Sequence, residues 1–304
     1  DPRIIRAAAQ VHEEGIGMPI LLGHPEGIRA QIQELGLEFD PVIYEPLAEH
    51  EKRREYAEAF YQMRLRKGVS RTTAERLTGS RMTFGLMMLK MGDADAYLNG
   101  RSHEYPDVIR PALQIFHTRD NVRVASGVYI MIIKRRVYFF TDATVNIDPD
   151  AETLAEIAIL AADFARTLGI EPRVAMLSFS NFGSAPHPAS DKVRDAARIV
   201  RHRRPDILCD GEMQADTAVV ADIVEKRFPF SQVKDANVLV FPDLQSANVS
   251  YKLLSRLTDA EAIGPILLGV GAPIHVLQAG DDVEDIVAMA AVAAVDAQSR
   301  KQSG

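Results

Sequence analysis

Residues 171–180 read EPRVAMLSFS, a run of apolar and β-branched side chains that gives way to small polar ones. A segment with helical periodicity, 188–202, comes next, and a second short apolar segment, 207–209, follows it. Short apolar runs that alternate with longer helical segments are typical of parallel strands whose faces are covered by helices. This stretch therefore predicts an α/β protein.

The same alternation continues in both directions along the chain. The expected strands are residues 18–22, 42–44, 94–98, 122–133, 137–141, 174–178, 207–209, 238–241 and 274–277. The expected helices are residues 3–13, 25–35, 49–67, 72–77, 80–91, 107–117, 151–168, 188–202, 213–227, 244–256 and 283–298. We therefore expect mainly parallel sheets covered by helices.

One segment near the middle of the chain breaks the alternation. Two apolar runs, 122–133 and 137–141, are joined by Lys134, Arg135 and Arg136, which predicts a β-hairpin. We expect the chain to pass there from one α/β subdomain to another. The first subdomain is expected to comprise residues 1–119 plus 274–304, without its first strand, and the second residues 120–273.

The first residues read as the start of a helix, with Asp1 as its cap and Pro2 in its first turn. A strand is expected before such a helix in an alternating fold. We therefore expect residue 1 to lie inside a longer natural chain.

Composition limits the class of protein. The chain has 304 residues, is 47% hydrophobic, carries a net charge of −7 and contains one cysteine. A nucleic-acid partner is not expected, because phosphate backbones favour a dominant basic face. The single cysteine fits a reducing cytoplasm, and the longest apolar run, 286–295, is about half as long as a bilayer requires. We expect a cytoplasmic protein that does not bind membranes.

Five short strings identify a family. They are RLRKG at 64–68, IRPALQ at 109–114, EPRVAMLSFS at 171–180, DGEMQAD at 210–216 and FPDL at 241–244. In order and spacing they resemble the phosphate acetyl/butyryltransferases, and the resemblance extends from Ala7 to about Gln298. It implies a phosphotransacetylase-like fold, with a cleft between two α/β domains in which an acyl group moves between coenzyme A and inorganic phosphate.

The resemblance also implies a set of ligand-binding residues. Guanidinium groups suit these ligands because they pair with phosphate oxygens bidentately. The loop 178–184 follows an expected strand and precedes a helix, so it is either a phosphate-binding loop or an ordinary connection. The predicted acyl-CoA- and phosphate-binding residues are Arg64, Arg101, Arg110, Ser178, Ser180, Asn248, Arg256 and Asp285.

The chain departs from the family in the segment before its last helix. Where the family has Asn-Asp-Leu-Ser-Arg-Gly, this chain reads HVLQAG at 275–280, so Gln278 and Ala279 replace the serine and arginine that serve catalysis. A cation at a developing oxyanion is usually the largest catalytic contribution. Asp285 matches the family's proposed general base, although a carboxylate in the first turn of a helix is also favoured by the helix dipole.

A second departure affects the pocket for the acyl phosphate. The family has Gly-Ala-Ala/Val-His followed by small hydroxyl residues, whereas this chain reads GRSHEYP at 100–106. Glu104 introduces a carboxylate where a phosphate is expected to bind, and Tyr105 fills space. We therefore expect no catalytic residues in a working arrangement.

These features together resemble the phosphotransacetylase-like C-terminal domain of bacterial NADP-dependent malic enzymes. That resemblance implies a catalytically degenerate domain that binds acetyl-CoA as an allosteric effector and mediates oligomerisation, at least as a dimer. It implies no cofactor in this domain, and NADP with Mg²⁺ or Mn²⁺ for malic enzyme domains of the same chain. The alternatives are an active phosphate acyltransferase, with Gln278 and Arg101 in place of the lost groups, and a structural dimerisation domain without a ligand.

Other polar residues give weaker signals. The densest basic cluster comprises Arg198, Arg201, Arg203 and Arg204, and it is either a solvated helix end or an anchor for phosphates or a partner domain. Cys209 is expected to serve packing. The histidines show no spacing typical of a metal site.

Overall fold

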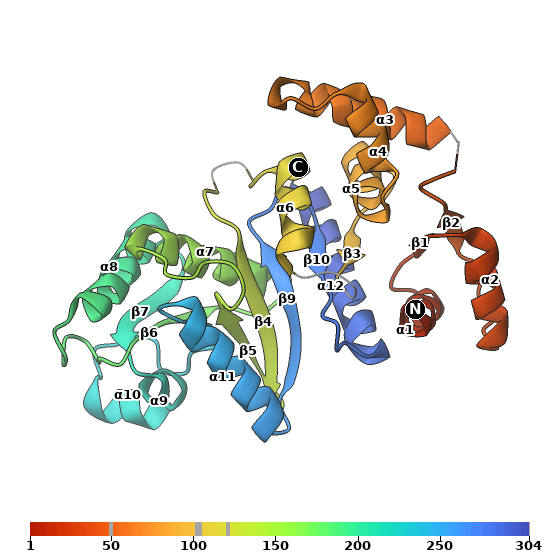
Figure 1. Cartoon of the computed structure of the whole chain (residues 1–304). Coiled ribbons are helices and arrows are strands. Elements are labelled where there is room, and N and C mark those ends of the chain that lie inside the picture. The colour runs from red at the N-terminus through yellow and green to blue at the C-terminus, as the bar shows by residue number, and fades with distance from the viewer. Residues whose placement is uncertain (49–50, 101–104, 120–121, 304) are drawn as a thin grey trace. The chain divides into compact units, whose positions relative to one another are not determined.

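The computed structural model describes residues 1–48, 51–100, 105–119 and 122–303, and the chain forms two units (Figure 1). Unit 1 comprises Asp1–His117 and Val270–Gly304, and unit 2 comprises Thr118–Gly269. The boundaries expected from the sequence lie at 119/120 and 273/274. None of the described helices is long and apolar enough to cross a membrane.

Unit 2 is built on a six-stranded mixed sheet in the order β7-β6-β8-β5-β4-β9. Strands β5, β8, β6 and β7 are parallel to one another, whereas β4 is antiparallel to both of its neighbours. The strands are β4 (Ser126–Ile133), β5 (Arg136–Thr141), β6 (Arg173–Leu177), β7 (Leu208–Met213), β8 (Val238–Val240) and β9 (Glu261–Leu268). The helices are α7 (Ala151–Thr167), α8 (Pro188–Arg203), α9 (Ala215–Val219), α10 (Ala221–Arg227) and α11 (Leu244–Leu257).

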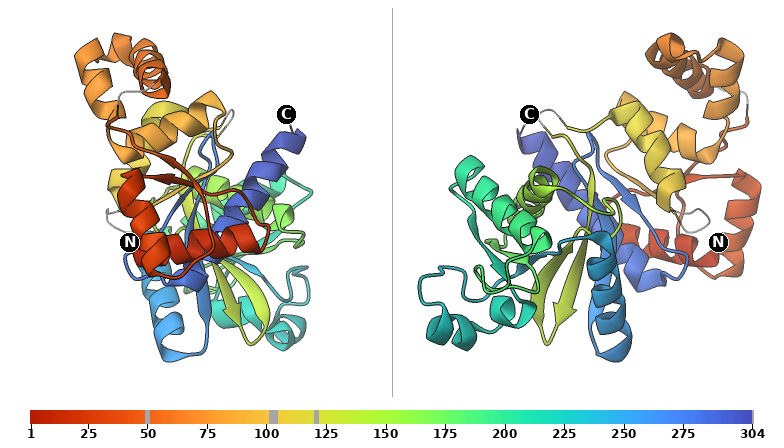
Figure 2. Two further views of the ribbon diagram at one scale, coloured as in Figure 1. Left: turned by 90° about the vertical axis from the view of Figure 1, so that its right-hand side faces the viewer. Right: turned by 60° about the vertical axis from the view of Figure 1, so that its left-hand side comes forward.

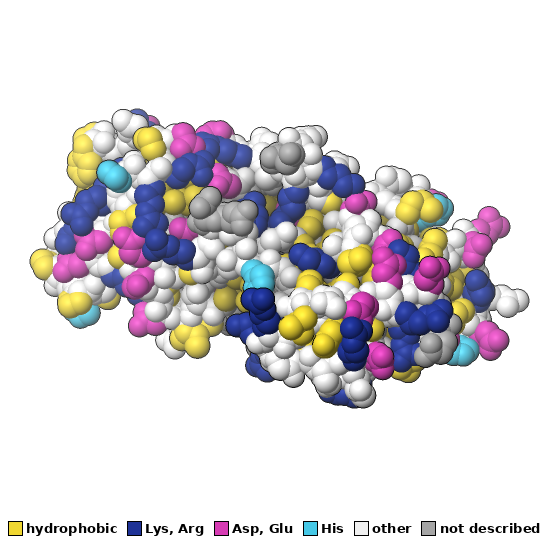
Figure 3. Space-filling view, turned by 90° about the horizontal axis from the view of Figure 1, so that it is seen from above, with side chains coloured by type: hydrophobic (Ala, Val, Ile, Leu, Met, Phe, Trp, Pro, Cys, Tyr) yellow, Lys and Arg dark blue, Asp and Glu magenta, His cyan; other side chains and the backbone are white. Residues whose placement is uncertain are grey.

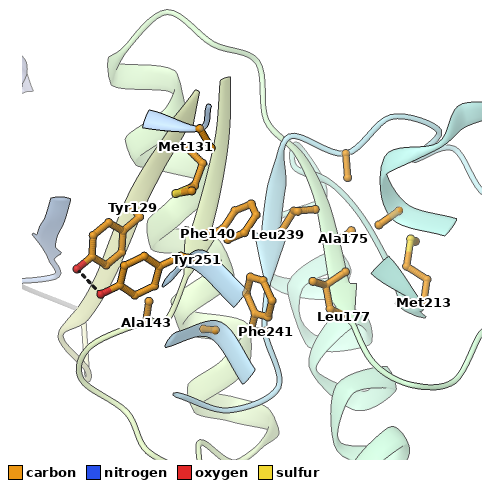
Figure 4. Close-up of a cluster of buried hydrophobic side chains, with 14 of the residues drawn as sticks. Tyr129, Met131, Phe140, Ala143, Ala175, Leu177, Met213, Leu239, Phe241 and Tyr251 are labelled. Atoms are coloured by element: carbon orange, nitrogen blue, oxygen red, sulfur yellow. Dashed lines mark hydrogen bonds between the residues drawn. The ribbon is translucent and has the colours of Figure 1, made fainter. Parts of the chain in front are cut away.

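Helices cover both faces of this sheet, as the alternation of strands and helices predicts (Figures 1 and 2). Two neighbouring residues of β5 contact opposite layers, because successive side chains of a strand point to opposite faces of the sheet. Phe139 packs edge-on against Phe164 of α7, and Phe140 contacts Phe241 on the other face. On that second face Tyr129 of β4 stacks on Tyr251 of α11 with ring centroids 4.0 Å apart, and its hydroxyl donates to that of Tyr251 at 3.0 Å (Figure 4).

The predicted hairpin is confirmed as β4–β5. Ile133 pairs with Arg136, so the turn consists of Lys134 and Arg135 alone. Both have positive φ, of 49° and 65°, which is the backbone of a type I′ turn. Arg136 belongs to the strand.

Strand β9 is absent from the sequence-based prediction. The segment contains Gly264 and Pro265, which interrupt a strand pattern because proline has no N–H to donate. The structure accommodates them at the edge of the sheet, where the register with β4 shifts between Val128 and Ile130. The prediction of one helix over 213–227 is also wrong: Met213 still belongs to β7, and Val220, with an extended backbone, separates α9 from α10.

Unit 1 contains two parallel strand pairs surrounded by helices. Its strands are β1 (Ile20–Leu22) paired with β2 (Val42–Tyr44), and β3 (Tyr97–Asn99) paired with β10 (Ile274–Val276). Its helices are α1 (Pro2–Glu13), α2 (Pro25–Glu34), α3 (Glu51–Arg64), the 3₁₀ turn η1 (Leu65–Lys67), α4 (Arg71–Thr78), α5 (Arg81–Met91), α6 (Tyr105–Phe116) and α12 (Val283–Ser303).

The N-terminal helix of unit 1 begins as predicted. The side chain of Asp1 accepts the backbone N–H of Arg3 at 2.9 Å, which caps α1. Helix α1 packs against α12, so the first and last helices of the chain lie side by side.

Candidate functional site

The two segments that depart from the family begin at the carboxyl ends of adjacent parallel strands, β3 and β10. The backbone N–H of Leu277 donates to the carbonyl of Asn99 at 2.7 Å, which continues the pairing beyond the strands. Gly100 has a φ of 138°, and a Cβ at this position would lie 2.2 Å from the carbonyl oxygen of Leu277. Ligands of parallel α/β sheets bind at this kind of edge. The candidate site in unit 1 therefore lies where these strands end.

The turn after β10 is closed by a buried carboxylate. Asp281 accepts the backbone N–H of Gln278 at 2.7 Å, and its own N–H donates to the carbonyl of Gln278 at 3.2 Å. The side chains of Gln278 and Ala279 are exposed at the tip of this turn. Both positions that differ from the family therefore lie on the exposed tip of a turn that Asp281 closes.

Asp285 occupies the first turn of α12 in a reciprocal pair with Asp282. The N–H of Asp285 donates to Asp282 at 3.0 Å, and the N–H of Asp282 donates to Asp285 at 3.1 Å, which is the geometry of a capping box. Burial raises the pKa of Asp285 above its ordinary value, against the lowering by the backbone hydrogen bond from Asp282. The carboxylate therefore caps the helix and is also a stronger base than an exposed aspartate.

Two of the predicted arginines approach helix α6. Arg110 is an exposed residue of α6 itself. Arg64, at the end of α3, donates from Nη1 to the carbonyl of Gln114 at 3.4 Å, one helical turn after Arg110. The structure brings these two guanidinium groups to one helix of unit 1. Arg101, together with Ser102, His103 and Glu104, lies outside the described residues.

In unit 2 the loop after β6 is built around the buried side chain of Glu212. Its Oε1 accepts from the hydroxyl of Ser180 at 3.0 Å and from the N–H of Gly183 at 2.6 Å. Glu212 is fully buried, and its Oε2 has no hydrogen-bond partner among the described residues. The carboxylate of Glu212 therefore fixes the shape of the loop.

Most backbone amides of this loop are already used inside the protein. The acceptors lie within the loop, on Glu212 or on β7. They serve the N–H groups of Ser178, Ser180, Asn181, Phe182, Gly183, Ser184 and Ala185. A phosphate-binding loop needs free amides that point at the ligand. The occupied amides favour an ordinary strand-to-helix connection, and Ser180 is fully buried within the loop.

The last two predicted residues lie on α11. Asn248 donates to the carbonyl of Ala143 at 3.4 Å, at the carboxyl end of β5. Arg256 is exposed in the last turn of α11, about 12 Å from Asn248 along the helix axis. Ser178 and Asn248 thus share the carboxyl edge of the parallel strands of unit 2, whereas Arg256 lies at the far end of α11.

Two polar residues of unit 2 with a structural role were missed in the sequence. One is Glu212, and the other is Asp142, whose buried carboxylate accepts the backbone N–H groups of Gly127, Thr144 and Asn146 at 2.9–3.0 Å. Asp142 directly follows an apolar strand and precedes turn residues, which is the signal that points to such a carboxylate.

Cys209 lies within the sheet of unit 2. Cys209 is buried on β7, and burial raises the pKa of its thiol to about 12, as packing predicts. Among the described residues no group of three or more His, Cys, Asp or Glu side chains is placed to hold a metal ion.

The chain matches the phosphate acetyl/butaryl transferase family over residues 1–294. It belongs to this family. It is 43% identical to the phosphate acetyltransferase of Thermoanaerobacterium thermosaccharolyticum, over 98% of this chain and 93% of that protein. The crystal structure of a phosphotransacetylase from Streptococcus pyogenes superposes with a TM-score of 0.92 at 40% identity, covering 98% of this chain and 92% of that one.

A malic enzyme is among the relatives of this family member. The chain is 38% identical to the NADP-dependent malic enzyme of Escherichia coli over 99% of its own length and 40% of that protein. The phosphate acetyltransferases of T. thermosaccharolyticum and Bacillus subtilis match at 43% and 40% identity over 93% and 92% of their own length. The family and fold expected from the sequence are confirmed, but the narrower expectation of a malic enzyme domain is not.

Proposed function

We propose that this chain transfers an acyl group between coenzyme A and inorganic phosphate, at a rate lowered by the residues of the turn after β10. The observation that carries the proposal is the similarity to phosphate acetyltransferases along nearly the whole chain. It favours the active acyltransferase, which the sequence leaves as an alternative, over the degenerate domain.

The reaction needs a bound phosphate and a group that exchanges a proton with the thiol. A phosphate oxygen attacks the thioester carbonyl carbon, the C–S bond breaks, and the departing thiolate of coenzyme A takes up a proton. Arg64 and Arg110 bind the phosphate, because two guanidinium groups brought to one helix supply several parallel N–H donors.

Asp285 exchanges the proton with the thiol. Its raised pKa, caused chiefly by burial, makes it a better proton acceptor in the direction that forms acyl-CoA. By microscopic reversibility the protonated form donates to the thiolate in the other direction. The capping hydrogen bonds with Asp282 hold the carboxylate in place for both steps.

The turn after β10 sets the rate. In the family, the residue that matches position 279 is the arginine that stabilises the anionic transition state. This chain has alanine at position 279 and therefore lacks that charge. Loss of one preorganised donor of this kind typically costs a factor of about 100 to 1,000 in rate. We expect a slow acyltransferase.

A second candidate is an acetyl-CoA-binding regulatory domain without turnover. Gln278 and Ala279 favour it, because they are exposed where the family has its catalytic serine and arginine. The similarity to the malic enzyme of E. coli favours it as well. In this case acetyl-CoA is the effector and the chain forms a homo-oligomer. NADP and a divalent metal ion then serve malic enzyme domains.

One pair of assays separates the candidates. Formation of acetyl-CoA from acetyl phosphate and coenzyme A is followed in the presence of the purified chain, and binding of acetyl-CoA is measured by calorimetry. Turnover that Asp285→Asn lowers by a factor of about 100 or more and Glu284→Gln preserves supports acyl transfer. Saturable binding without turnover supports the regulatory domain, and the absence of both contradicts the two candidates.

A further inference from the structure

The turn after β10 contains a buried acidic residue, which is uncommon in this chain. Most acidic side chains are exposed or half-buried, and Figure 3 shows several of them on one face of the chain. Asp281 is only 7% exposed, and it is the one buried acidic residue among the described residues of unit 1. A buried carboxylate is costly unless hydrogen-bond donors compensate it. The donors that Asp281 meets therefore indicate its role.

The two buried acidic residues of unit 2 show what such a carboxylate does in this protein. Asp142 accepts several backbone N–H groups of the segments around it, and Glu212 accepts the N–H of Gly183. Each lies at the carboxyl end of a parallel strand, β5 or β7, and fixes the loop there. Asp281 likewise follows β10, at the edge where the candidate site of unit 1 lies.

Asp281 closes the turn by binding both main-chain groups of Gln278. Its Oδ2 accepts the N–H of Gln278 at 2.7 Å, and its own N–H donates to the carbonyl of Gln278 at 3.2 Å. Arg3 of α1 reaches the same turn, because its Nη1 donates to the carbonyl of Asp281 at 3.4 Å. Three exposed residues, 278–280, form the tip between the buried Leu277 and Asp281. The main chain of the tip is thus held at both of its ends.

The hydrogen bonds of this turn continue directly into those of α12. Asp282 follows Asp281 and forms the capping pair with Asp285. Ile286 donates its N–H to the carbonyl of Asp282 at 3.3 Å, and the N–H of Leu277 is bound to β3. A main chain that is hydrogen-bonded in this way from Leu277 to Ile286 holds the tip in a fixed position relative to the carboxylate of Asp285.

We propose that Asp281 is a positioning residue for acyl transfer, which holds the tip of the turn in register with the proton-exchanging Asp285. This role rests on the proposed function, because the tip and Asp285 have to act on the same thioester. An error of about 1 Å in such an arrangement can cost a factor of about 100 in rate. Asp281 is buried, so it acts through the turn and not on the substrates.

Initial rates of acetyl-CoA formation test this role. Asp281→Ala removes the acceptor for Gln278 and should lower kcat about tenfold or more. The KM for acetyl phosphate should stay within about twofold, because Arg64 and Arg110 bind the phosphate. Asp281→Asn keeps an acceptor oxygen and should retain kcat within about threefold. Asp40→Ala is the matched control, since Asp40 is an exposed aspartate of the same unit, and it should change neither constant.

A second readout separates positioning from a loss of fold. Gln278→Ser with Ala279→Arg should raise the rate about a hundredfold in the wild-type chain. The same pair should gain less than about tenfold in Asp281→Ala, because the new arginine is then held less firmly. Asp281→Ser has a shorter acceptor and should give a kcat between those of Asp281→Asn and Asp281→Ala. It takes the place of Asp281→Ala if that variant does not fold.

The outcomes distinguish this role from the proposed function. The positioning role alone is overturned if Asp281→Ala has the kcat of the wild type, if the loss lies only in KM, or if Asp281→Asn loses as much as Asp281→Ala. An equal gain from the double substitution with and without Asp281 overturns it as well. No turnover in the wild type or in the double variant of the tip overturns acyl transfer and this role together.

Discussion

Gly100 and the main chain of Leu277 are in such close contact that no side chain fits at residue 100, because a Cβ there would lie 2.2 Å from the carbonyl oxygen of Leu277. This contact joins two segments that are far apart in the sequence. Each of them leads directly into residues that differ from the family, Arg101 on one side and Gln278 on the other. The strands that lead into the two departures are therefore joined at their carboxyl ends.

Replacing Gly100 by alanine should destabilise the protein by about 3 kcal/mol, since it adds both steric overlap and a strained backbone with a φ of 138°. Chemical denaturation measures the change. Gly17→Ala is the control, because its Cβ would meet no atom within 4 Å, and it should change the stability by less than about 0.5 kcal/mol. Equal effects of the two substitutions would contradict the contact.

The double substitution Gln278→Ser with Ala279→Arg should raise the rate of acetyl-CoA formation by about a hundredfold, because it restores a cation for the transition state. Both side chains are exposed, so the fold should tolerate the change. Ala279→Lys alone supplies a point charge without the guanidinium fork and should give a smaller gain. An unchanged rate in the double variant would show that this turn does not limit catalysis.

Asp285→Asn should lower the turnover by a factor of about 100 or more, because the amide cannot exchange the thiol proton. Its stability at neutral pH should not fall. Burial raises the pKa of Asp285, so the ionised side chain costs stability above that pKa, and the neutral amide removes this cost while its oxygen still accepts from Asp282. Paired kinetic and unfolding measurements check both statements. If Asp285→Asn loses as much stability as Asp285→Ala, Asp285 serves only as the cap of α12.

Asp296 makes the stability of unit 1 sensitive to acid. Burial opposes its ionisation, but His275, 3.4 Å away, and Arg300, which donates at 2.7 Å, outweigh burial and lower its pKa to about 2. A depressed carboxyl pKa contributes stability above the unfolded-state value of 3.8, and this contribution is lost as the pH falls from there to about 2. The contribution at neutral pH is about 2 kcal/mol.

Unfolding curves recorded between pH 7 and pH 2 measure this effect. Asp296→Asn should be less stable than the wild type at pH 7, and the difference should shrink below pH 4. Asp95→Asn is the comparison, since Asp95 pairs with Lys301 at the surface with both side chains 68% exposed, and it should have little effect at any pH. If the difference in stability between Asp296→Asn and the wild type does not depend on pH, Asp296 is not stabilised as an ion pair with Arg300.

Glu212→Ala should destabilise unit 2 by about 2 kcal/mol or more, because it leaves the hydroxyl of Ser180 and the N–H of Gly183 without their acceptor. Glu212→Gln keeps one acceptor oxygen and should cost less. Denaturation of the two variants against the wild type provides the comparison. If both substitutions cost the same, Glu212 does not act through these two hydrogen bonds.

Patterns that are local in the sequence predicted most of the fold. Apolar runs in β2 and β8 and the basic turn at Lys134 and Arg135 mark their elements without reference to the rest of the chain. Strand β9 was not predicted because Gly264 and Pro265 have a low preference for strands. Its pairing with β4, which stabilises it nevertheless, cannot be read from the segment itself.

The sequence predicted which residues belong to the candidate site, but not how they are arranged. The sequence singled out Arg64, Arg110 and Asp285, but it could not show that Arg64 reaches α6 or that Asp285 also caps α12. It also could not show that the amides of Phe182 and Gly183 after β6 are occupied, because this depends on the buried Glu212 of another strand. Such contacts between distant segments exist only in the folded chain.

The rate at which the purified chain forms acetyl-CoA from acetyl phosphate and coenzyme A tests the proposed function most directly. We predict saturable turnover, slow for an acyltransferase, which Arg110→Ala and Asp285→Asn lower by a factor of about 100 or more and Glu284→Gln leaves unchanged. Wild-type turnover no faster than the uncatalysed reaction, in a folded chain that still binds acetyl-CoA, would contradict acyl transfer and leave the regulatory domain as the function of this family member.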